Sequence, residues 1–219
     1  MAGFDHGWCS RGDLDQSFLD AAAVCSTLLR LDVVRERWAE PSALPELSVG
    51  ALACHLARQV TRAAELLAAP STLPVLAAVD EHYARAAWVT STSLTDQAND
   101  RTTDDAEAAL GFDWMLSRYD ADLAAVAQLL RGEAAERVDI PWQGWSLRRN
   151  DFLHTRLLEL VVHSADLAAS VDLPAPDFPD AAFTPVLTLL SRLAVRRHGQ
   201  GAVVGTLTRR ERARNISAF

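Results

Sequence analysis

Four ionisable residues recur at helical spacing in the segment HTRLLELVVHSADLAAS: Arg156, Glu159, His163 and Asp166. At about 100° per residue they fall within an arc of about 80° on a helix. The other directions of this segment are mostly apolar, and a helix that is apolar nearly all round is buried. The polar stripe is therefore buried or lines a cavity. An unpaired buried charge costs several kcal/mol, so these four side chains need partners.

Two interpretations of this stripe remain open. In the first, Glu159 pairs with Arg156 and His163, and Asp166 pairs elsewhere, which makes the stripe a structural network. In the second, Glu159 and His163, which lie one helical turn apart, bind a single divalent metal ion. Two ligands with this spacing also meet one ion in helical zinc motifs. A metal site of this kind requires a third ligand from a facing helix.

His55 is a candidate for the third ligand, because it lies at the border of the apolar stripe on its own predicted helix. This position suits the wall of a pocket, and it suits a half-buried histidine equally well. His154 and His82 are rivals. His154 lies well off the stripe of Glu159 and His163, and His82 lies on a less regular helix. The geometry favours His55 without excluding the other two.

Long amphipathic helices must position these residues, and the apolar periodicity predicts four of them. They cover residues 14–38, 48–69, 104–131 and 149–171. Such helices, joined by connectors, predict an all-α four-helix bundle. Segment 74–88 then crosses one end of the bundle, 90–103 is a polar loop and 132–147 is a connector. No strand is expected before residue 200.

The C-terminal region is predicted as a small addition to this bundle. We expect one domain over residues 1–173 and a short extension over 174–219. Within the extension, a helix over 184–198 begins with Thr184 as its N-cap and Pro185 in its first turn. Residues 199–219 fit either a final helix or a short strand with a loop.

Composition narrows the class of protein. The 219 residues carry a net charge of −8 and contain no lysine, which argues against nucleic acid or an anionic membrane as a partner. Three cysteines at wide spacing indicate a reducing cytoplasm, and no apolar run is long enough to span a bilayer.

Some single residues also carry expectations. Cys54 is expected to be buried, and Cys9 and Cys25 are expected to contribute only to packing. Arg58 and Arg62 lie on the His55 side of their predicted helix. A solvated face is expected for them, and contact with a substrate carboxylate is the alternative. A monomer and a homodimer are both possible.

Two segments resemble one known family. Residues 38–58, WAEPSALPELSVGALACHLAR, are similar to a signature of the mycothiol-dependent maleylpyruvate isomerases and their DinB-like relatives. Residues 138–173 resemble the second signature of that family, which has Arg-x-x-Glu-x-x-x-His-x-x-Asp-Leu at its centre. The two motifs occur in the expected order, each on its expected helix. The likeness spans most of residues 14–173.

The resemblance implies a DinB-like four-helix bundle that holds a divalent metal ion, usually zinc. By motif position its ligands are His55, Glu159 and His163. The resemblance thus selects the third ligand that geometry left open. It also implies mycothiol as the thiol cosubstrate. Cys54 stands where the family usually has alanine, and the larger C-terminal domain of the family is reduced here to residues 174–219. The resemblance therefore does not determine the substrate.

These expectations lead to a functional hypothesis. Two histidines and one glutamate leave zinc with an open coordination position, as in catalytic sites. A metal-bound thiol is deprotonated, so a mycothiol-dependent S-transferase or cis–trans isomerase acting on a small electrophile is expected. Arg156 would orient Glu159, and Asp166 would support the imidazole. Trp142 and Gln143, with Trp145, would wall the pocket mouth. A metal-dependent hydrolase and a non-catalytic metal- or small-molecule-binding bundle are the alternatives.

Overall fold

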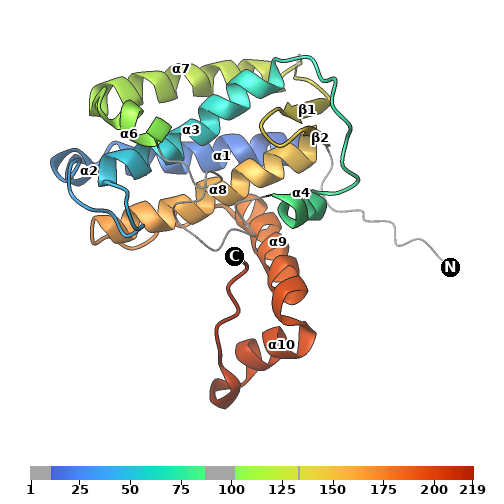
Figure 1. Cartoon of the computed structure of the whole chain (residues 1–219). Helices are drawn as coiled ribbons and strands as arrows, with labels where there is room; N and C mark the ends of the chain where they lie inside the picture. Colours follow the sequence, from blue (N-terminus) through green and yellow to red (C-terminus); the bar gives the residue numbers. More distant parts are fainter. Residues whose placement is uncertain (1–10, 87–101, 133) are drawn as a thin grey trace.

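The computed structural model describes residues 11–86, 102–132 and 134–219, and it is mostly helical. Four long helices lie side by side: α1 (Arg11–Leu29), α3 (Val49–Leu67), α7 (Phe112–Leu130) and α8 (Arg149–Ser170) (Figure 1). Helix α8 packs against α1 and α3, and α3 packs against α7. The all-α prediction is confirmed at this level. The apolar faces of these helices form one core.

Helices α3 and α8 begin and end close to the predicted positions. Ser48 is the N-cap of α3, and its hydroxyl accepts a hydrogen bond from the Ala51 backbone N–H at 3.0 Å. Gly50, in the first turn, allows the Trp38 ring to lie directly against the backbone, because a Cβ there would come within 2.5 Å of that ring. Helix α8 follows a strand without a break. These two helices carry the residues of the predicted metal site.

The predicted helix over 14–38 is wrong in its second half. Helix α1 ends at Leu29, and a separate short helix, α2 (Asp32–Glu36), follows. Leu31 between them is extended, with φ −65° and ψ 137°. Neither glycine nor proline marks this break, and Val33 continues the apolar periodicity of α1 across it. The sequence pattern could not reveal the turn.

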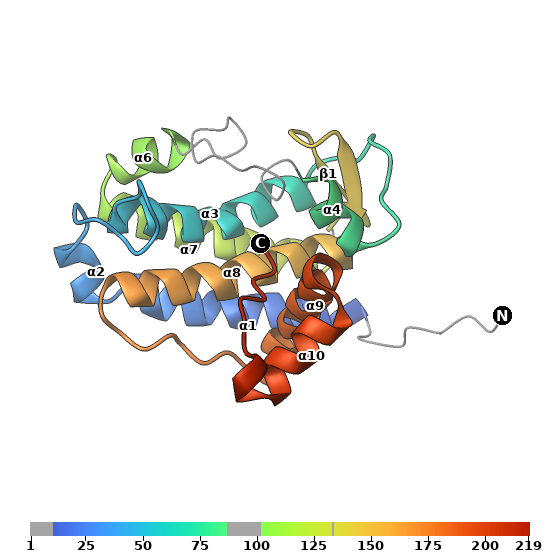
Figure 2. The ribbon, with the colours of Figure 1, turned by 60° about the horizontal axis from the view of Figure 1, so that its bottom comes forward.

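The predicted helix over 104–131 is also interrupted. Helix α6 (Thr102–Ala108) ends before Gly111, which has φ 96° and ψ 166°, and α7 begins at the next residue. This backbone conformation is essentially restricted to glycine. Figure 2 shows the result, with α6 lying over α3 apart from the main body of α7. Most of the predicted loop 90–103 lies outside the described residues, and its last two residues belong to α6.

A β-hairpin replaces part of the predicted connector 132–147, so the expectation of no strand before residue 200 is wrong. Strands β1 (Arg137–Ile140) and β2 (Trp145–Arg148) pair antiparallel. Each strand has four residues, which is too short to show a reliable alternation. Gly144 in the turn has φ 80°. Beside the hairpin, the described part of the predicted helix over 74–88, which ends at residue 86, is helical only in α4 (Val79–Arg85). Its first residues are not helical, and Val75 there pairs with Ser146.

Helix α9 (Asp180–His198) starts four residues earlier than predicted, so Thr184 is not its N-cap and Pro185 lies inside it. A proline cannot donate to the carbonyl four residues before it, which is that of Ala181. The Ser17 hydroxyl from α1 donates to this carbonyl instead, at 3.0 Å. The contact explains why the helix tolerates its proline, and it fastens α9 to the bundle.

The rest of the C-terminal region is helical. Helix α10 (Gln200–Thr208) and the 3₁₀ turn η2 (Arg210–Arg212) follow α9. Of the two alternatives predicted for residues 199–219, the structure therefore has the final helix and not the short strand. Figure 2 shows α9 and α10 on the side of the bundle formed by α1 and α8. The domain boundary at residue 173 stays a prediction. Across the described ranges, every helix is too short or too polar to span a bilayer. Cys9 lies outside these ranges.

Candidate metal centre

Three of the predicted site residues converge between α3 and α8. His55 comes from α3, and Glu159 and His163 come from consecutive turns of α8. One ligand atom from each lies within 4.8 Å of the other two. Their side chains are 15–16% exposed, so the cluster is largely buried and keeps a small contact with solvent. The structure therefore brings together residues that are more than 100 positions apart.

Each histidine of the cluster is held by a carboxylate at Nδ1. Asp104 Oδ2 lies 3.1 Å from His55 Nδ1, and Asp166 Oδ2 lies 3.0 Å from His163 Nδ1. The Nε2 atom of His163 lies 3.2 Å from Glu159 Oε2, so the nitrogen that points into the cluster is not the one bound to aspartate. Histidines that ligate metals commonly have such a carboxylate on the other nitrogen.

Sequence reasoning missed Asp104, although it identified Asp166. Asp166 is three residues from His163 on the same helix, so spacing alone suggests the contact. Asp104 is 49 residues from His55 and is brought to it by α6. Its side chain is only 2% exposed. The one available signal was an acidic residue near a predicted helix start, which is common for other reasons.

The donor atoms suit a divalent metal ion. Two imidazoles and a carboxylate are the ligands of many catalytic zinc sites, with bonds of about 2.0–2.2 Å. Ligand atoms at the corners of a tetrahedron of that size lie about 3.4 Å apart. The spacing in this cluster is close to that value for His163 and Glu159, at 3.2 Å, and at most 4.8 Å for the set. The residues therefore fit such an ion after a small closure of the side chains.

Electrostatics in the cluster keep Glu159 ionised. Burial by itself raises the pKa of Glu159, but the hydrogen bond and charge of His163, with Arg156 and His55, hold it well below its usual range. Burial lowers the pKa of His163, whereas its hydrogen bonds to Asp166 and Glu159 raise it to about 9. Burial lowers the pKa of His55 despite its bond to Asp104. Metal is bound by an anionic carboxylate and neutral imidazoles, so metal binding at neutral pH would release a proton from His163.

Arg156 acts on Glu159 through its charge rather than through a hydrogen bond. Its Nη1 donates to the Gln59 side-chain oxygen, and its Nε donates to the Thr155 hydroxyl at 3.2 Å. Its positive charge contributes to the low pKa of Glu159. The structural-network interpretation also placed Asp166 with a partner other than the cluster, whereas Asp166 bonds to His163.

The rival histidines lie outside the cluster, each with its own partner. His154 Nε2 lies 2.9 Å from the Pro185 carbonyl oxygen on α9. His82 Nδ1 accepts a hydrogen bond from Trp145 Nε1 at 3.2 Å. Burial, with the charge of Arg156, lowers the pKa of His82 to about 4, so it is neutral at physiological pH. The structure therefore separates His55 from the two residues that sequence geometry could not exclude.

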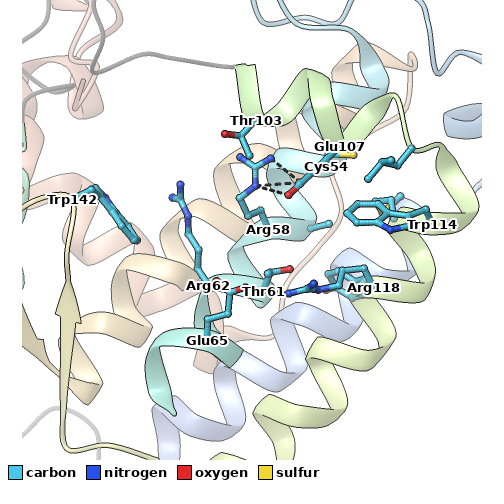
Figure 3. Close-up of a pocket in the computed structure, with 14 residues that line it drawn as sticks. Cys54, Arg58, Thr61, Arg62, Glu65, Thr103, Glu107, Trp114, Arg118 and Trp142 are labelled. Carbon is cyan, nitrogen blue, oxygen red and sulfur yellow. Dashed lines mark hydrogen bonds and ion pairs between the residues drawn. The ribbon is translucent and has the colours of Figure 1, made fainter. Parts of the chain in front are cut away.

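A cavity of about 470 Å³ lies along α3, between α6, α7 and the hairpin turn (Figure 3). The expected solvated face is wrong for Arg58, whose side chain is 11% exposed and forms ion pairs with Asp104 and Glu107, each at 2.7 Å. Arg62 is half-buried, and its guanidinium lies 4.9 Å from the centre of the Trp142 ring. Arg58 and Asp104 therefore connect this cavity to His55.

The other predicted pocket residues divide between two places. Trp142 lines the cavity and is 55% exposed, whereas Gln143 is not among the described residues that line it. Trp145 points to His82 instead. Cys54 lines the cavity but is 1% exposed, and burial with the nearby charge of Glu107 raises its pKa to about 12. It is buried, as predicted, and poorly reactive.

A comparison with protein families matches residues 19–168 to the mycothiol maleylpyruvate isomerase N-terminal domain. The match covers more than half of the chain. The chain belongs to this family. Helix α3 and all but the last two residues of α8 lie inside the matched region of this mycothiol maleylpyruvate isomerase family domain, and so do His55, Glu159 and His163. Neither a curated protein nor a solved structure matches the chain.

Proposed function

We propose that this member of the mycothiol maleylpyruvate isomerase family is a metal-dependent enzyme that uses a low-molecular-weight thiol. Its reaction is mycothiol S-transfer or mycothiol-dependent cis–trans isomerisation of a small electrophilic metabolite. The observation that supports this proposal best is the convergence of His55, Glu159 and His163 in a partly exposed cluster. Family membership supports mycothiol as the thiol.

In this proposal the three residues hold a divalent ion, for which zinc is the best fit. When bound, such an ion with an open coordination position lowers the pKa of a thiol that contacts it and so supplies a thiolate at neutral pH. Glu159 provides the one formal negative charge among the ligands. Asp104 and Asp166 hold the two imidazoles in position, at 3.1 and 3.0 Å. Arg156 stabilises the ionised form of Glu159.

The thiol and the electrophile meet beside this cluster. We infer that Trp142 and Gln143, in the turn of the hairpin, contact the thiol cosubstrate at the pocket mouth. Addition of the thiol sulfur to an electrophilic carbon is common to both reactions. Rotation about the former double bond and elimination of the thiolate give the cis–trans isomer. Retention of the new carbon–sulfur bond, with return of the thiol proton to the neighbouring carbon, gives the conjugate.

The finer features of the fold belong to the same proposal. The packing of α1, α3, α7 and α8 supports a DinB-like four-helix bundle over residues 1–173. Residues 174–219 form an extension that packs on it through α9, for example by the contact of Ser17 with Ala181. We infer a cytoplasmic protein that acts as a monomer or a homodimer.

The contacts of the carboxylates argue against the hydrolase alternative. A hydrolase needs a general base that can take a proton from water. Asp104 and Asp166 are the described carboxylates nearest to the ligands, and each is engaged by an imidazole. Glu159 itself is a proposed ligand. A group with the freedom to act as the base is therefore not evident among the described residues.

Elemental analysis and a thiol titration test the proposal. The purified wild-type protein is expected to bind one equivalent of divalent metal, and His163→Ala to lose it. His198→Ala, a histidine on α9 that bonds to the Ser217 carbonyl, is the matched control and should keep its metal. The metal-loaded protein should then bind mycothiol in preference to glutathione. Full metal content in His163→Ala would refute the site, and metal binding without thiol affinity would favour a non-catalytic bundle.

A further inference from the structure

One of the three arginines that line the cavity differs from the other two. Arg58 and Arg118 each form ion pairs with two carboxylates, at 2.7–3.1 Å. Arg62 forms no ion pair or hydrogen bond within the part of the chain that the structure describes, although it is half-buried. Its guanidinium stacks on the Trp142 ring, and Figure 3 shows its side chain between Trp142 and Arg58.

The surroundings of Arg62 are unfavourable for an unpaired cation. Burial and the positive charges of Arg156 and Arg58 lower its pKa to about 10. The residue is still charged at neutral pH, because that value is well above 7. Buried guanidinium groups are normally paired, since desolvation of the charge is costly. The stack on the Trp142 ring holds the guanidinium in place and leaves its N–H edges for another group.

The position of Arg62 relates it to the metal centre. It follows His55 by seven residues on α3, which is two turns, about 10 Å along the axis and about 20° around it. The two side chains therefore leave the same face of the helix. The charge of Glu159 also reaches Arg62, because it opposes the fall in the pKa of that residue.

The geometry points to Arg62, supported by the face of Trp142, as the residue that binds a carboxylate group of the electrophilic substrate. This inference rests on the proposed function, because it places the substrate beside the metal cluster. A carboxylate matches a single guanidinium through two parallel hydrogen bonds. A phosphate dianion fits less well, because Asp104 and Glu107, which form ion pairs with the neighbouring Arg58, would repel its double negative charge.

Binding of unreactive probes to the metal-free protein tests this assignment. Monoethyl succinate and diethyl succinate differ by one carboxylate and cannot react with a thiol. We expect the wild-type protein to bind the half-ester at least about tenfold more tightly than the diester in a calorimetric titration. Arg62→Gln should lose about tenfold to hundredfold in affinity for the half-ester and no longer distinguish the two esters. Arg62→Lys should retain part of the preference for the half-ester over the diester, because lysine keeps the positive charge but cannot form two parallel hydrogen bonds to one carboxylate.

Arg118→Gln is the matched control, because Arg118 lines the same cavity but is already paired with Asp122 and Glu65. Its affinity for the half-ester should stay within about threefold of wild type. Circular dichroism melts would establish that each variant is folded. Equal binding of the two esters by wild type, or unchanged binding of the half-ester by Arg62→Gln, would overturn the assignment. Tighter binding of inorganic phosphate than of the half-ester would also overturn it.

The outcome can be separated from that of the proposed function. The ester titrations contain neither metal nor thiol, so they report on the arginine alone. If the wild-type protein failed to bind stoichiometric metal but still preferred the half-ester, the proposed function would be refuted and the carboxylate site would stand. A normal metal content with no preference between the esters would refute the carboxylate site and leave the metal-dependent function standing.

Discussion

Replacement of Asp104 by asparagine should weaken metal binding without removing any proposed ligand. Asp104 lies 3.1 Å from His55 Nδ1 and is 2% exposed, so solvent does little to screen its charge. Loss of a carboxylate on a ligating imidazole typically reduces metal affinity about tenfold to hundredfold, which is about 1.4–2.7 kcal/mol. Because Asp104 is almost fully buried, we expect an effect near the upper end of this range.

The assay is a zinc competition titration against a chelator of known affinity, at pH 7.5, with the wild type and three variants. Asp166→Asn makes the equivalent change at His163, but Asp166 is 28% exposed, so its effect should lie near tenfold. Glu107→Gln removes the other partner of Arg58 and does not touch His55, so its zinc affinity should match that of wild type.

The metal-free stability of these variants separates positioning from folding. Asp104→Asn also removes one of two carboxylates from the buried Arg58, and it should lower the free energy of unfolding by about 1–3 kcal/mol. A zinc affinity of Asp104→Asn equal to that of wild type would refute the reasoning. An equal loss in Glu107→Gln would show instead that the disturbance spreads through Arg58.

Three further predictions concern stability. The folded pKa of His82 is about 4, below its unfolded value near 6.5, so the contribution of the neutral imidazole to stability is complete above pH 6.5 and falls as the pH drops toward 4. Between pH 7 and 4.5, the free energy of unfolding in urea should fall by about 2 kcal/mol more in the wild type than in His82→Gln. Gly50→Ala should destabilise the protein by about 1–3 kcal/mol and change the fluorescence of Trp38, because the new Cβ would overlap that ring, and unchanged stability would contradict the close approach. The new Cβ in Gly111→Ala meets no neighbouring atom, so the expected loss of about 1–3 kcal/mol in the free energy of unfolding, measured by urea denaturation, must come from the backbone conformation.

Local signals predicted the elements that carry the proposed ligands. Ser48 marks the start of α3, and the polar stripe of α8 stands out because its other faces are apolar. Both signals depend on residues within a few turns of one another, and such local patterns can be recognised directly in the sequence. The spacing of Glu159 and His163 belongs to the same class. His55 required the family resemblance, because geometry left His82 and His154 open.

Contacts between distant segments were not predictable in this way. The partner of His55 is Asp104, which reaches it only because the chain turns at Gly111 and places α6 over α3. The pairing of Arg58 depends on the same helix, so the residue was assigned to a solvated face. The break at Leu31 has no glycine or proline to announce it. Each of these features is decided by tertiary packing, which a single sequence does not display.

The proline in α9 determines how that helix can be seated. The Ala181 carbonyl has no donor of its own in the helix, and Ser17 of α1 supplies one. If α9 moved by one residue along α1, the Ser17 hydroxyl would face a carbonyl that already accepts a hydrogen bond. The Ala181 carbonyl oxygen would then lack a hydrogen-bond donor, at a cost of about 1–3 kcal/mol. A backbone defect within one helix thus selects a single register against its neighbour.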